Sequence, residues 1–147
     1  MRPLVPVGMG IEYLMWVLGQ PGPDGKTEWQ RLRLDLPLQP KERPRQGQGR
    51  SFTSPRYRQW QQAAQEALRG QWGDRETLQY ALFGIEFHGH ARSDVDNLEG
   101  AVLDAAVKAG VFRDDRCSRL PAHLSYWQPA AQPVAILYVR PWWPPRK

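Results

Sequence analysis

Residues 93–115 read SDVDNLEGAVLDAAVKAGVFRDD and contain six of the 15 acidic residues in a chain that is basic as a whole. The six are Asp94, Asp96, Glu99, Asp104, Asp114 and Asp115. Apolar residues recur between them at helical spacing and would form one stripe: Val95, Leu98, Val102, Ala105 and Ala109. Asp96 and Glu99 have the spacing of a capping box, and Gly110 can end a helix. We expect an amphipathic helix over about residues 97–109.

Helix stability alone does not explain why acidic residues stand at both ends of this helix. Carboxylates in a first turn favour the positive end of the helix dipole, which accounts for Asp96 and Glu99 alone. Carboxylates that converge repel one another and lose water, so they persist mainly around a hard cation such as Mg²⁺. If the chain returns along a neighbouring strand after the helix, the Asp114–Asp115 pair can meet Asp94 and Asp96. The sequence therefore permits a carboxylate metal site.

Two other metal sites fit the residues less well. An EF-hand loop would need an acid or Asn at position 98 and Gly at position 99, where the chain has Leu98 and Glu99. His88 and His90 are two residues apart and could bind a transition metal together with Asp94. Histidines at strand ends are common on protein surfaces, so we favour the carboxylate site. A basic protein that brings a polyanion to Mg²⁺ has the parts for phosphodiester hydrolysis.

Strand patterns flank the acidic segment. Residues 77–89 (TLQYALFGIEFHG) are apolar on both faces, as in a central strand, with Gly84 as a possible bulge. Residues 119–127 and 134–139 predict two closing strands, and the tail PWWPPRK cannot extend a sheet. Near the N-terminus, residues 11–18 and 28–38 predict a hairpin around the turn QPGPDGK.

A second helix is expected over residues 55–69. Ser54 suits the N-cap position and Pro55 the first helical position. Apolar residues then recur at helical spacing until Gly70, which can stop the helix: Tyr57, Trp60, Ala64 and Leu68. The expected fold class is α/β (α+β), a single domain with a mixed sheet packed by the helices near 55–69 and 97–109.

Residues 39–54 (QPKERPRQGQGRSFTS) lack apolar periodicity, so we expect a loop there. Residues 31–58 hold eight Lys and Arg against two acids, a local net charge of +6 in a chain whose net charge is +5. Arginines spaced by Pro, Gly and Gln suit contacts with the phosphates of a nucleic acid, although a solvated loop is the simpler reading. The residues that we expect to bind DNA are Arg43, Arg45, Arg50 and Arg56.

The whole-chain properties agree with a nucleic-acid partner. A length of 147 residues predicts one domain. The basic charge favours a polyanionic partner, or serves only solubility. The single cysteine, Cys117, cannot form an intrachain disulfide or a cysteine-rich zinc site, as expected of a cytoplasmic protein. Neither a secretory leader nor a run of 18 apolar residues occurs, so we expect no secretion and no membrane span.

The acidic segment resembles the signature of the RusA-type Holliday junction resolvases. That signature is D-x-D-N-L, then A-x-x-D-A on a short helix, then a turn and D-D. It corresponds here to Asp94, Asp96, Asn97 and Leu98, then Ala101, Asp104 and Ala105, then Asp114–Asp115. Residues 40–60 (PKERPRQGQGRSFTSPRYRQW) are similar to the family's Pro/Arg-rich loop leading into a helix.

The resemblance implies a small α/β homodimer that binds four-way DNA junctions and nicks two strands symmetrically, with Mg²⁺ as cofactor. A two-fold dimer also suits the approximate two-fold symmetry of a junction. By resemblance, the catalytic acids are Asp94, Asp96 and Asp115, which would hold the metal. Residues 1–147 would form one nuclease domain, with residues 1–28 as an N-terminal extension or hairpin.

One position departs from the family pattern. The family usually has a Lys four residues after the second acid of D-x-D, and this chain has Gly100 there. Arg92, Lys108 or Arg113 could supply the missing positive charge. Two alternatives to a resolvase therefore stay open: a DNA-binding protein of the same fold that has lost catalysis, and a protein-interaction module that uses the Trp-rich ends, including Trp142–Trp143.

Overall fold

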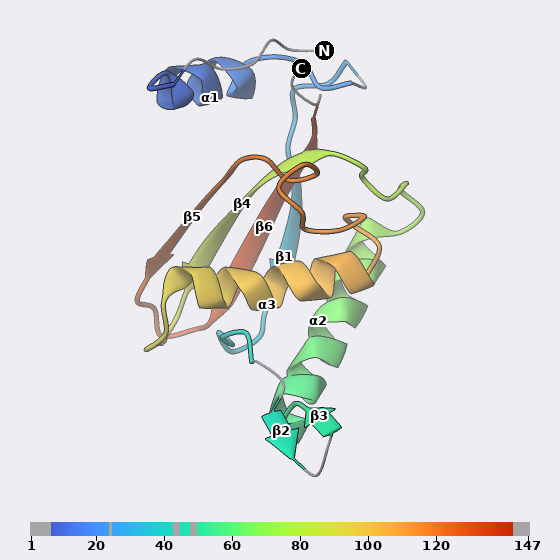
Figure 1. Cartoon of the computed structure of the whole chain (residues 1–147), viewed down its shortest axis with the longest axis vertical. Coiled ribbons are helices and arrows are strands. Elements are labelled where there is room, and N and C mark those ends of the chain that lie inside the picture. Colours follow the sequence, from blue (N-terminus) through green and yellow to red (C-terminus); the bar gives the residue numbers. More distant parts are fainter. Residues whose placement is uncertain (1–6, 24, 43–44, 48–49, 143–147) are drawn as a thin grey trace.

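Four strands form one mixed sheet in the order β1-β6-β4-β5 (Figure 1). They are β1 (Gln30–Leu34), β4 (Ala81–His88), β5 (His123–Gln128) and β6 (Val134–Pro141). β6 pairs antiparallel with β1 and with β4, whereas β5 pairs parallel with β4. The structure is a computed structural model that describes residues 7–23, 25–42, 45–47 and 50–142. The mixed sheet with its helices confirms the predicted fold class.

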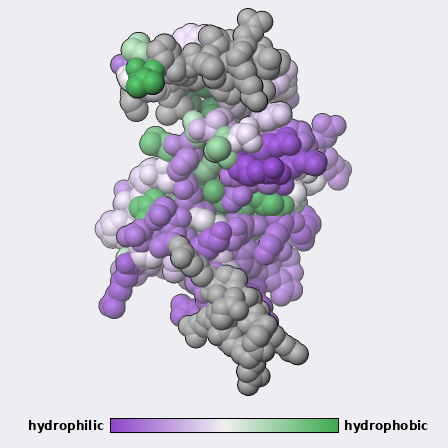
Figure 2. Space-filling view, viewed as in Figure 1, coloured by the Kyte–Doolittle hydropathy of each residue, from purple (hydrophilic) through white to green (hydrophobic). Residues whose placement is uncertain are grey.

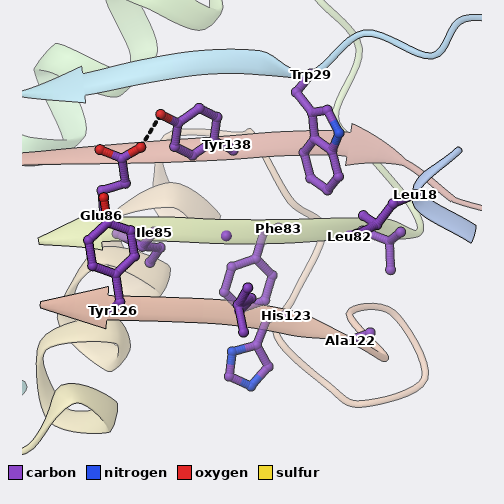
Figure 3. A pocket seen from close by; sticks show the side chains of 12 residues that line it. Leu18, Trp29, Leu82, Phe83, Ile85, Glu86, Ala122, His123, Tyr126 and Tyr138 are labelled. Atoms are coloured by element: carbon purple, nitrogen blue, oxygen red, sulfur yellow. Dashed lines mark hydrogen bonds between the residues drawn. The ribbon is translucent and has the colours of Figure 1, made fainter. Parts of the chain in front are cut away.

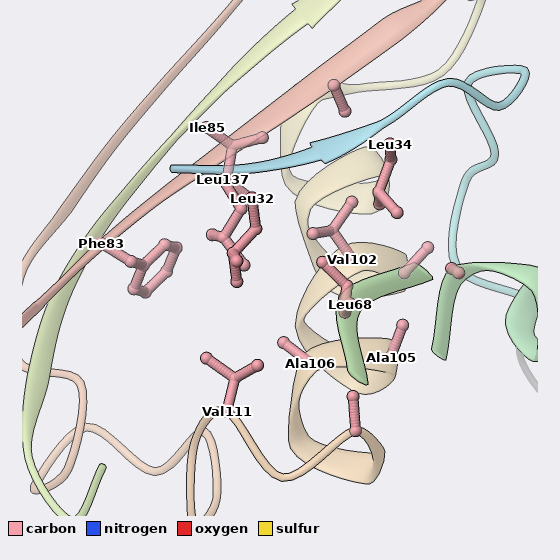
Figure 4. Close-up of a cluster of buried hydrophobic side chains, with 14 of the residues drawn as sticks. Leu32, Leu34, Leu68, Phe83, Ile85, Val102, Ala105, Ala106, Val111 and Leu137 are labelled. Atoms are coloured by element: carbon pink, nitrogen blue, oxygen red, sulfur yellow. The ribbon is translucent and has the colours of Figure 1, made fainter. Parts of the chain in front are cut away.

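Two helices, α2 (Pro55–Trp72) and α3 (Val95–Lys108), cover one face of this sheet (Figure 1). The core lies between them and the sheet. Figure 4 shows side chains from β1, α2, β4, α3 and β6 meeting there, and they include Leu32, Leu68, Ile85, Val102 and Leu137. Burial of these apolar side chains is the main term that fixes the helices on the sheet.

The α3 helix connects two parallel neighbouring strands, β4 and β5, in a β-α-β unit. The predicted apolar stripe explains its orientation, because Leu98, Val102 and Ala105 are buried. Gly110 adopts a φ of +86° directly after the Ala109 C-cap, as expected of a glycine that ends a helix. The polar beginning of α3 therefore lies at the carboxyl end of β4.

The N-terminal prediction was wrong. Residues 11–18 belong to helix α1 (Gly10–Leu18) and not to a strand, so only the second half of the expected hairpin, β1, exists. A short apolar run shows no period that separates a strand from a helix, which explains the error. Val17 packs with Leu82 and Trp142 in a small second cluster, and the Arg140 guanidinium donates to the Leu18 carbonyl over 2.9 Å.

The segments around α2 agree with the predictions at the start of the helix and differ from them before it and at its end. The expected loop contains two short antiparallel strands, β2 (Arg45–Gly47) and β3 (Arg50–Phe52). The Ser54 hydroxyl accepts a hydrogen bond from the Tyr57 N–H over 3.2 Å, which confirms the N-cap. The helix passes Gly70 and ends at Trp72, where Gly73 with a φ of +64° follows. A glycine without a positive φ need not stop a helix.

The other two corrections concern Gly84 and Glu99. Gly84 is not a bulge, because it pairs in register with Leu124 on one side and Tyr138 on the other. The capping box is also absent. The helix begins at Val95 with Asp94 as its N-cap residue, and the Glu99 side chain is directed to β5 instead.

Candidate functional site

The candidate site is built on the start of α3, where the chain leaves the central strand of the sheet. Asp94 is the N-cap residue and has extended backbone angles, yet its carboxylate accepts no capping hydrogen bond. Asp96 lies in the first turn, and both residues are exposed. An N-cap carboxylate normally satisfies a backbone N–H. Here the carboxylate stays available to a ligand.

Glu99 has a structural role one turn further along the helix. Its side chain is 11% exposed, and its Oε1 atom accepts a hydrogen bond from the Ser125 hydroxyl over 2.8 Å. The same oxygen lies 2.5 Å from Nδ1 of His123, whose ring stacks on Phe83. These contacts tie α3 to the edge strand β5. Glu99 therefore faces the sheet, whereas Asp94 and Asp96 face solvent.

The two acids of the Asp114–Asp115 pair lie in different surroundings. Asp114 closes a turn, since its carboxylate accepts from the Arg116 N–H over 3.0 Å and lies 3.1 Å from the Arg116 guanidinium. The hydrogen bond from the Arg116 N–H is the main cause that lowers the pKa of Asp114. Asp115 is exposed. Of the pair, Asp115 is thus the carboxylate that remains accessible.

Asp115 lies far from Asp94 within one chain. The α3 helix has 14 residues and so spans roughly 21 Å, and Asp94 precedes it whereas Asp115 follows it. The Ala81 N–H at the start of β4 donates to the Arg119 carbonyl, which places the segment after Asp115 at the opposite end of the strand from Asp94. In the described part of the chain, no group of three or more His, Cys, Asp or Glu is arranged to hold a metal ion.

The histidines of the alternative metal site point to different partners. The Nε2 atom of His88 lies 3.1 Å from a Glu86 oxygen, and its Nδ1 atom lies 2.9 Å from the Gln128 amide nitrogen. His90 is exposed and instead lines a surface hollow of about 550 Å³ next to Asp94. The other residues around this hollow are Leu38, Pro40, Ala91, Arg92 and Ser93.

The structure describes three of the four arginines that are expected to bind DNA. Arg43 lies outside the described residues. Arg45 begins β2 and Arg50 begins β3, so the two strands hold them on one small hairpin. Arg56 is exposed in the first turn of α2. In Figure 2 the molecular face that carries α2 and α3 is largely hydrophilic, as a surface for a charged partner would be.

Sequence reasoning missed the position of Lys41. Its N–H donates to the Asn97 carbonyl over 2.8 Å, so the segment after β1 is held against the first turn of α3. A Cβ atom at Gly100 would lie 3.0 Å from Cδ of Lys41. The two residues are far apart in sequence. A glycine within a predicted helix was the single available signal that another segment approaches there.

The opposite face of the sheet carries a second hollow of about 350 Å³, which is mainly apolar (Figure 3). Leu82, Glu86 and Tyr138 line it, and the Tyr138 hydroxyl donates to the Glu86 carboxylate. That hydrogen bond is the main cause that lowers the pKa of Glu86. Trp142 is buried against Val17, so it is a core residue and not part of an exposed interaction surface as the third alternative required. Trp143 lies outside the described residues.

Comparison of the sequence with known protein families places the chain in one of them. The sequence model of the family endodeoxyribonuclease RusA matches residues 35–120, which is more than half of the chain. The chain belongs to the RusA family. The RusA match runs from the residue after β1 to the segment before β5 and so includes Asp94, Asp96 and Asp115. No individual curated protein matches the chain.

The RusA match confirms the resemblance seen in residues 93–115 and makes the chain a member of a family of DNA-cleaving enzymes. The matched range leaves out α1, β1, β5 and β6. Within the described ranges, no helix combines the length and the apolar character that a membrane span requires.

Proposed function

We propose that this chain is a Mg²⁺-dependent, structure-selective endodeoxyribonuclease that resolves Holliday junctions by paired symmetric nicks in DNA recombination and repair. One observation carries the proposal: the Asp94 carboxylate stands at the N-cap of α3 without capping it, two residues before the exposed Asp96. The family match supplies the reaction class. Residues 1–147 would act as one nuclease domain, with residues 1–28 as an extension of it.

The side chains at the start of α3 suit Mg²⁺. Carboxylate oxygens are the ligands that this cation prefers, and it usually binds through one or two carboxylates while keeping several waters. Asp94 and Asp96 would supply these carboxylates. When bound, Mg²⁺ would activate water and neutralise charge on the scissile phosphate. Without the cation, the helix dipole already offsets part of the repulsion between the two acids.

We propose that a homodimer completes the site. Within one chain the length of α3 keeps Asp115 away from Asp94 and Asp96. In a two-fold dimer, each contact made by one subunit is made by the other in return. If Asp115 of one subunit lies beside Asp94 and Asp96 of the other, both sites gain a third carboxylate at once. Two equivalent sites would then face two equivalent strands of a junction.

Cleavage of a synthetic four-way junction tests the proposed reaction. With Mg²⁺, we expect paired nicks near the branch point and no nicking of a linear duplex of the same sequence. Asp96→Asn removes a carboxylate while it keeps the size of the side chain, so we expect nicking to fall by at least about 10²-fold with junction binding retained. Asp114→Asn serves as the matched control, because Asp114 is engaged with Arg116.

Two outcomes would contradict the proposal. Equal nicking by wild type and Asp96→Asn would show that the Asp96 carboxylate takes no part in the reaction. Tight junction binding without nicking by the wild-type protein would favour the alternative of a DNA-binding protein that has lost catalysis. Failure to bind DNA at all would favour a protein-interaction module.

The main DNA contact is proposed to be the basic segment that includes Arg43, Arg45, Arg50 and Arg56. Each phosphate contact releases counterions, so the slope of log affinity against log salt counts the contacts. Replacing Arg43, Arg45 and Arg50 with Ala should flatten that slope by about 3 units, measured by fluorescence anisotropy with a labelled junction. An unchanged slope would reject this segment as the DNA contact.

A DNA substrate and a single cysteine also support a cytoplasmic location.

A further inference from the structure

We propose that Lys41 supplies the cation that contacts the DNA phosphate at the Asp94–Asp96 site. This inference rests on the proposed function, since it assigns a DNA contact to the same site. Four observations on the described residues carry it: the anchoring of Lys41, its path across Gly100, the face of α3 on which it lies, and the neighbouring hollow.

Lys41 is anchored through its main chain at the start of α3. Its N–H donates to the Asn97 carbonyl over 2.8 Å. The preceding segment is held as well, because the Trp60 indole donates to the Pro37 carbonyl over 2.8 Å. The following residue, Glu42, accepts a hydrogen bond from the Ser54 hydroxyl over 2.7 Å. The origin of the Lys41 side chain is therefore fixed between α2 and α3.

The alkyl chain of Lys41 lies across the bare backbone at Gly100. A Cβ atom added at Gly100 would lie 3.0 Å from Cδ and 3.4 Å from Cβ of Lys41. Glycine inside a helix costs about 1 kcal/mol relative to alanine. Its presence in the middle of α3 is thus explained by the passage of Lys41 and not by helix stability.

The helix face that Lys41 crosses is the face of Asp96. Residues four apart lie one above the other on a helix, so Asp96, Gly100 and Asp104 share one face. The Lys41 ammonium lies 3.5 Å from an Asp104 carboxylate oxygen, and the side chain is 44% exposed. Asp96 is about 6 Å from Gly100 along the helix axis. A lysine that originates between the two acids can therefore exchange the Asp104 carboxylate for a phosphate held next to Asp96.

The hollow beside Asp94 gives a DNA strand a place next to this lysine. Pro40, the neighbour of Lys41, lines the hollow together with Arg92 and Ser93, the residues just before Asp94. The Ser93 hydroxyl is buried and has no hydrogen-bond partner within the described chain, so a polar group there would gain one. A phosphate seated between the hollow and the first turn of α3 would lie between Asp94 and Lys41.

The test distinguishes a specific contact between Lys41 and a DNA phosphate from the general effect of the protein's positive charge. Junction binding is measured against salt with Ca²⁺ in place of Mg²⁺, and the single-turnover nicking rate is measured with Mg²⁺. Lys41→Ala should flatten the salt slope by about 1 unit and lower the nicking rate on the order of 10²-fold. Lys41→Arg should keep most of the slope. Lys26→Ala changes the net charge equally in the turn between α1 and β1 and should change neither quantity appreciably.

Two variants at position 100 test the geometry. Gly100→Ala leaves the charge in place but pushes on Cδ of Lys41, so an intermediate loss of nicking rate is expected. Gly100→Lys introduced into Lys41→Ala returns a cation to the same helix face and should restore part of the slope and of the rate. Thermal unfolding of each variant checks that the fold is kept.

The outcomes distinguish this inference from the proposed function. If the wild type nicks junctions and Lys41→Ala behaves like Lys26→Ala in both measurements, Lys41 has no such role, while the nuclease proposal stands. If the wild type binds but does not nick, a flattened slope for Lys41→Ala still supports the phosphate contact, while the nuclease proposal falls. A wild type that does not bind DNA overturns both.

Discussion

A Cβ atom added at Gly84 would lie 2.9 Å from the carbonyl oxygen of Leu124 in β5, closer than side chains tolerate. Gly84→Ala should therefore push β5 away from β4 and lower the free energy of unfolding by about 1–3 kcal/mol. Gly70→Ala is the matched control, because nothing beyond the neighbouring backbone of its own helix lies within 4 Å of its added Cβ. That helical substitution should raise stability by roughly 0.5–1 kcal/mol. Urea unfolding measures both, and a Gly84→Ala variant as stable as the wild type would contradict the close contact.

At the same scale, the sequence placed Asp94 and Asp96 together at the start of α3, but it gave neither the distance to Asp115 nor the position of Lys41. Asp94 and Asp96 follow a strand and begin a helix, so local pattern was enough to place them together. The position of Lys41 depends on a tertiary approach to Gly100 that no local pattern contains. Glu99 was misjudged for a related reason: a capping box competes with Ser125 and His123, and these partners become known only when β5 is placed.

Within the sheet, Glu86 links β4 to β6 through a hydrogen bond from Tyr138. Hydrogen bonds from Tyr138 and then His88 lower the pKa of Glu86 in the folded protein. A lowered pKa means that the carboxylate stabilises the fold at pH values above its unfolded pKa, and that this contribution is lost as the pH falls through the folded value.

Glu86→Gln should therefore lower the free energy of unfolding by about 1 kcal/mol at pH 7, a modest effect because the side chain is partly exposed. The difference from wild type should begin to shrink as the pH falls below about 4.3, the usual value for an unfolded Glu, and should be lost as the pH falls through the lower folded pKa. Urea unfolding from pH 3 to pH 7 measures it, with Tyr138→Phe as the companion variant that removes the main donor. A difference that stays constant across this range would contradict the link to Glu86 ionisation.

The elements that periodicity defines were predicted well. Helices α2 and α3 and strands β1, β4 and β6 each show an apolar pattern that matches their burial. Helix α1 was mistaken for a strand because its apolar run is too short to show a period. The β2–β3 pair was also missed, since Arg, Gln and Gly carry no strand signal and the pairing itself holds the segment.

At the scale of the whole molecule, the separation of Asp94 from Asp115 along α3 makes a specific prediction about mixed subunits. Asp96→Asn and Asp115→Asn should each be inactive alone. A mixed dimer of the two variants pairs one wild-type Asp94–Asp96 half with one wild-type Asp115, so one complete site returns. Because the mixed dimer has one complete site, we expect mixing to restore nicking of one strand per junction, measured on a labelled junction. The absence of any recovery, with mixed dimers verified by mass spectrometry, would exclude a shared site.

The length of α3 has one more consequence, for how the proposed nuclease would respond to its own abundance. If each site needs groups from both ends of α3 on different subunits, a separated chain carries no complete site. Below the dissociation constant of the dimer, the amount of dimer rises with the square of the total protein. The cutting rate should follow this square law, so a twofold dilution would reduce it about fourfold. A cell could then keep a junction-cutting enzyme harmless by holding its level low.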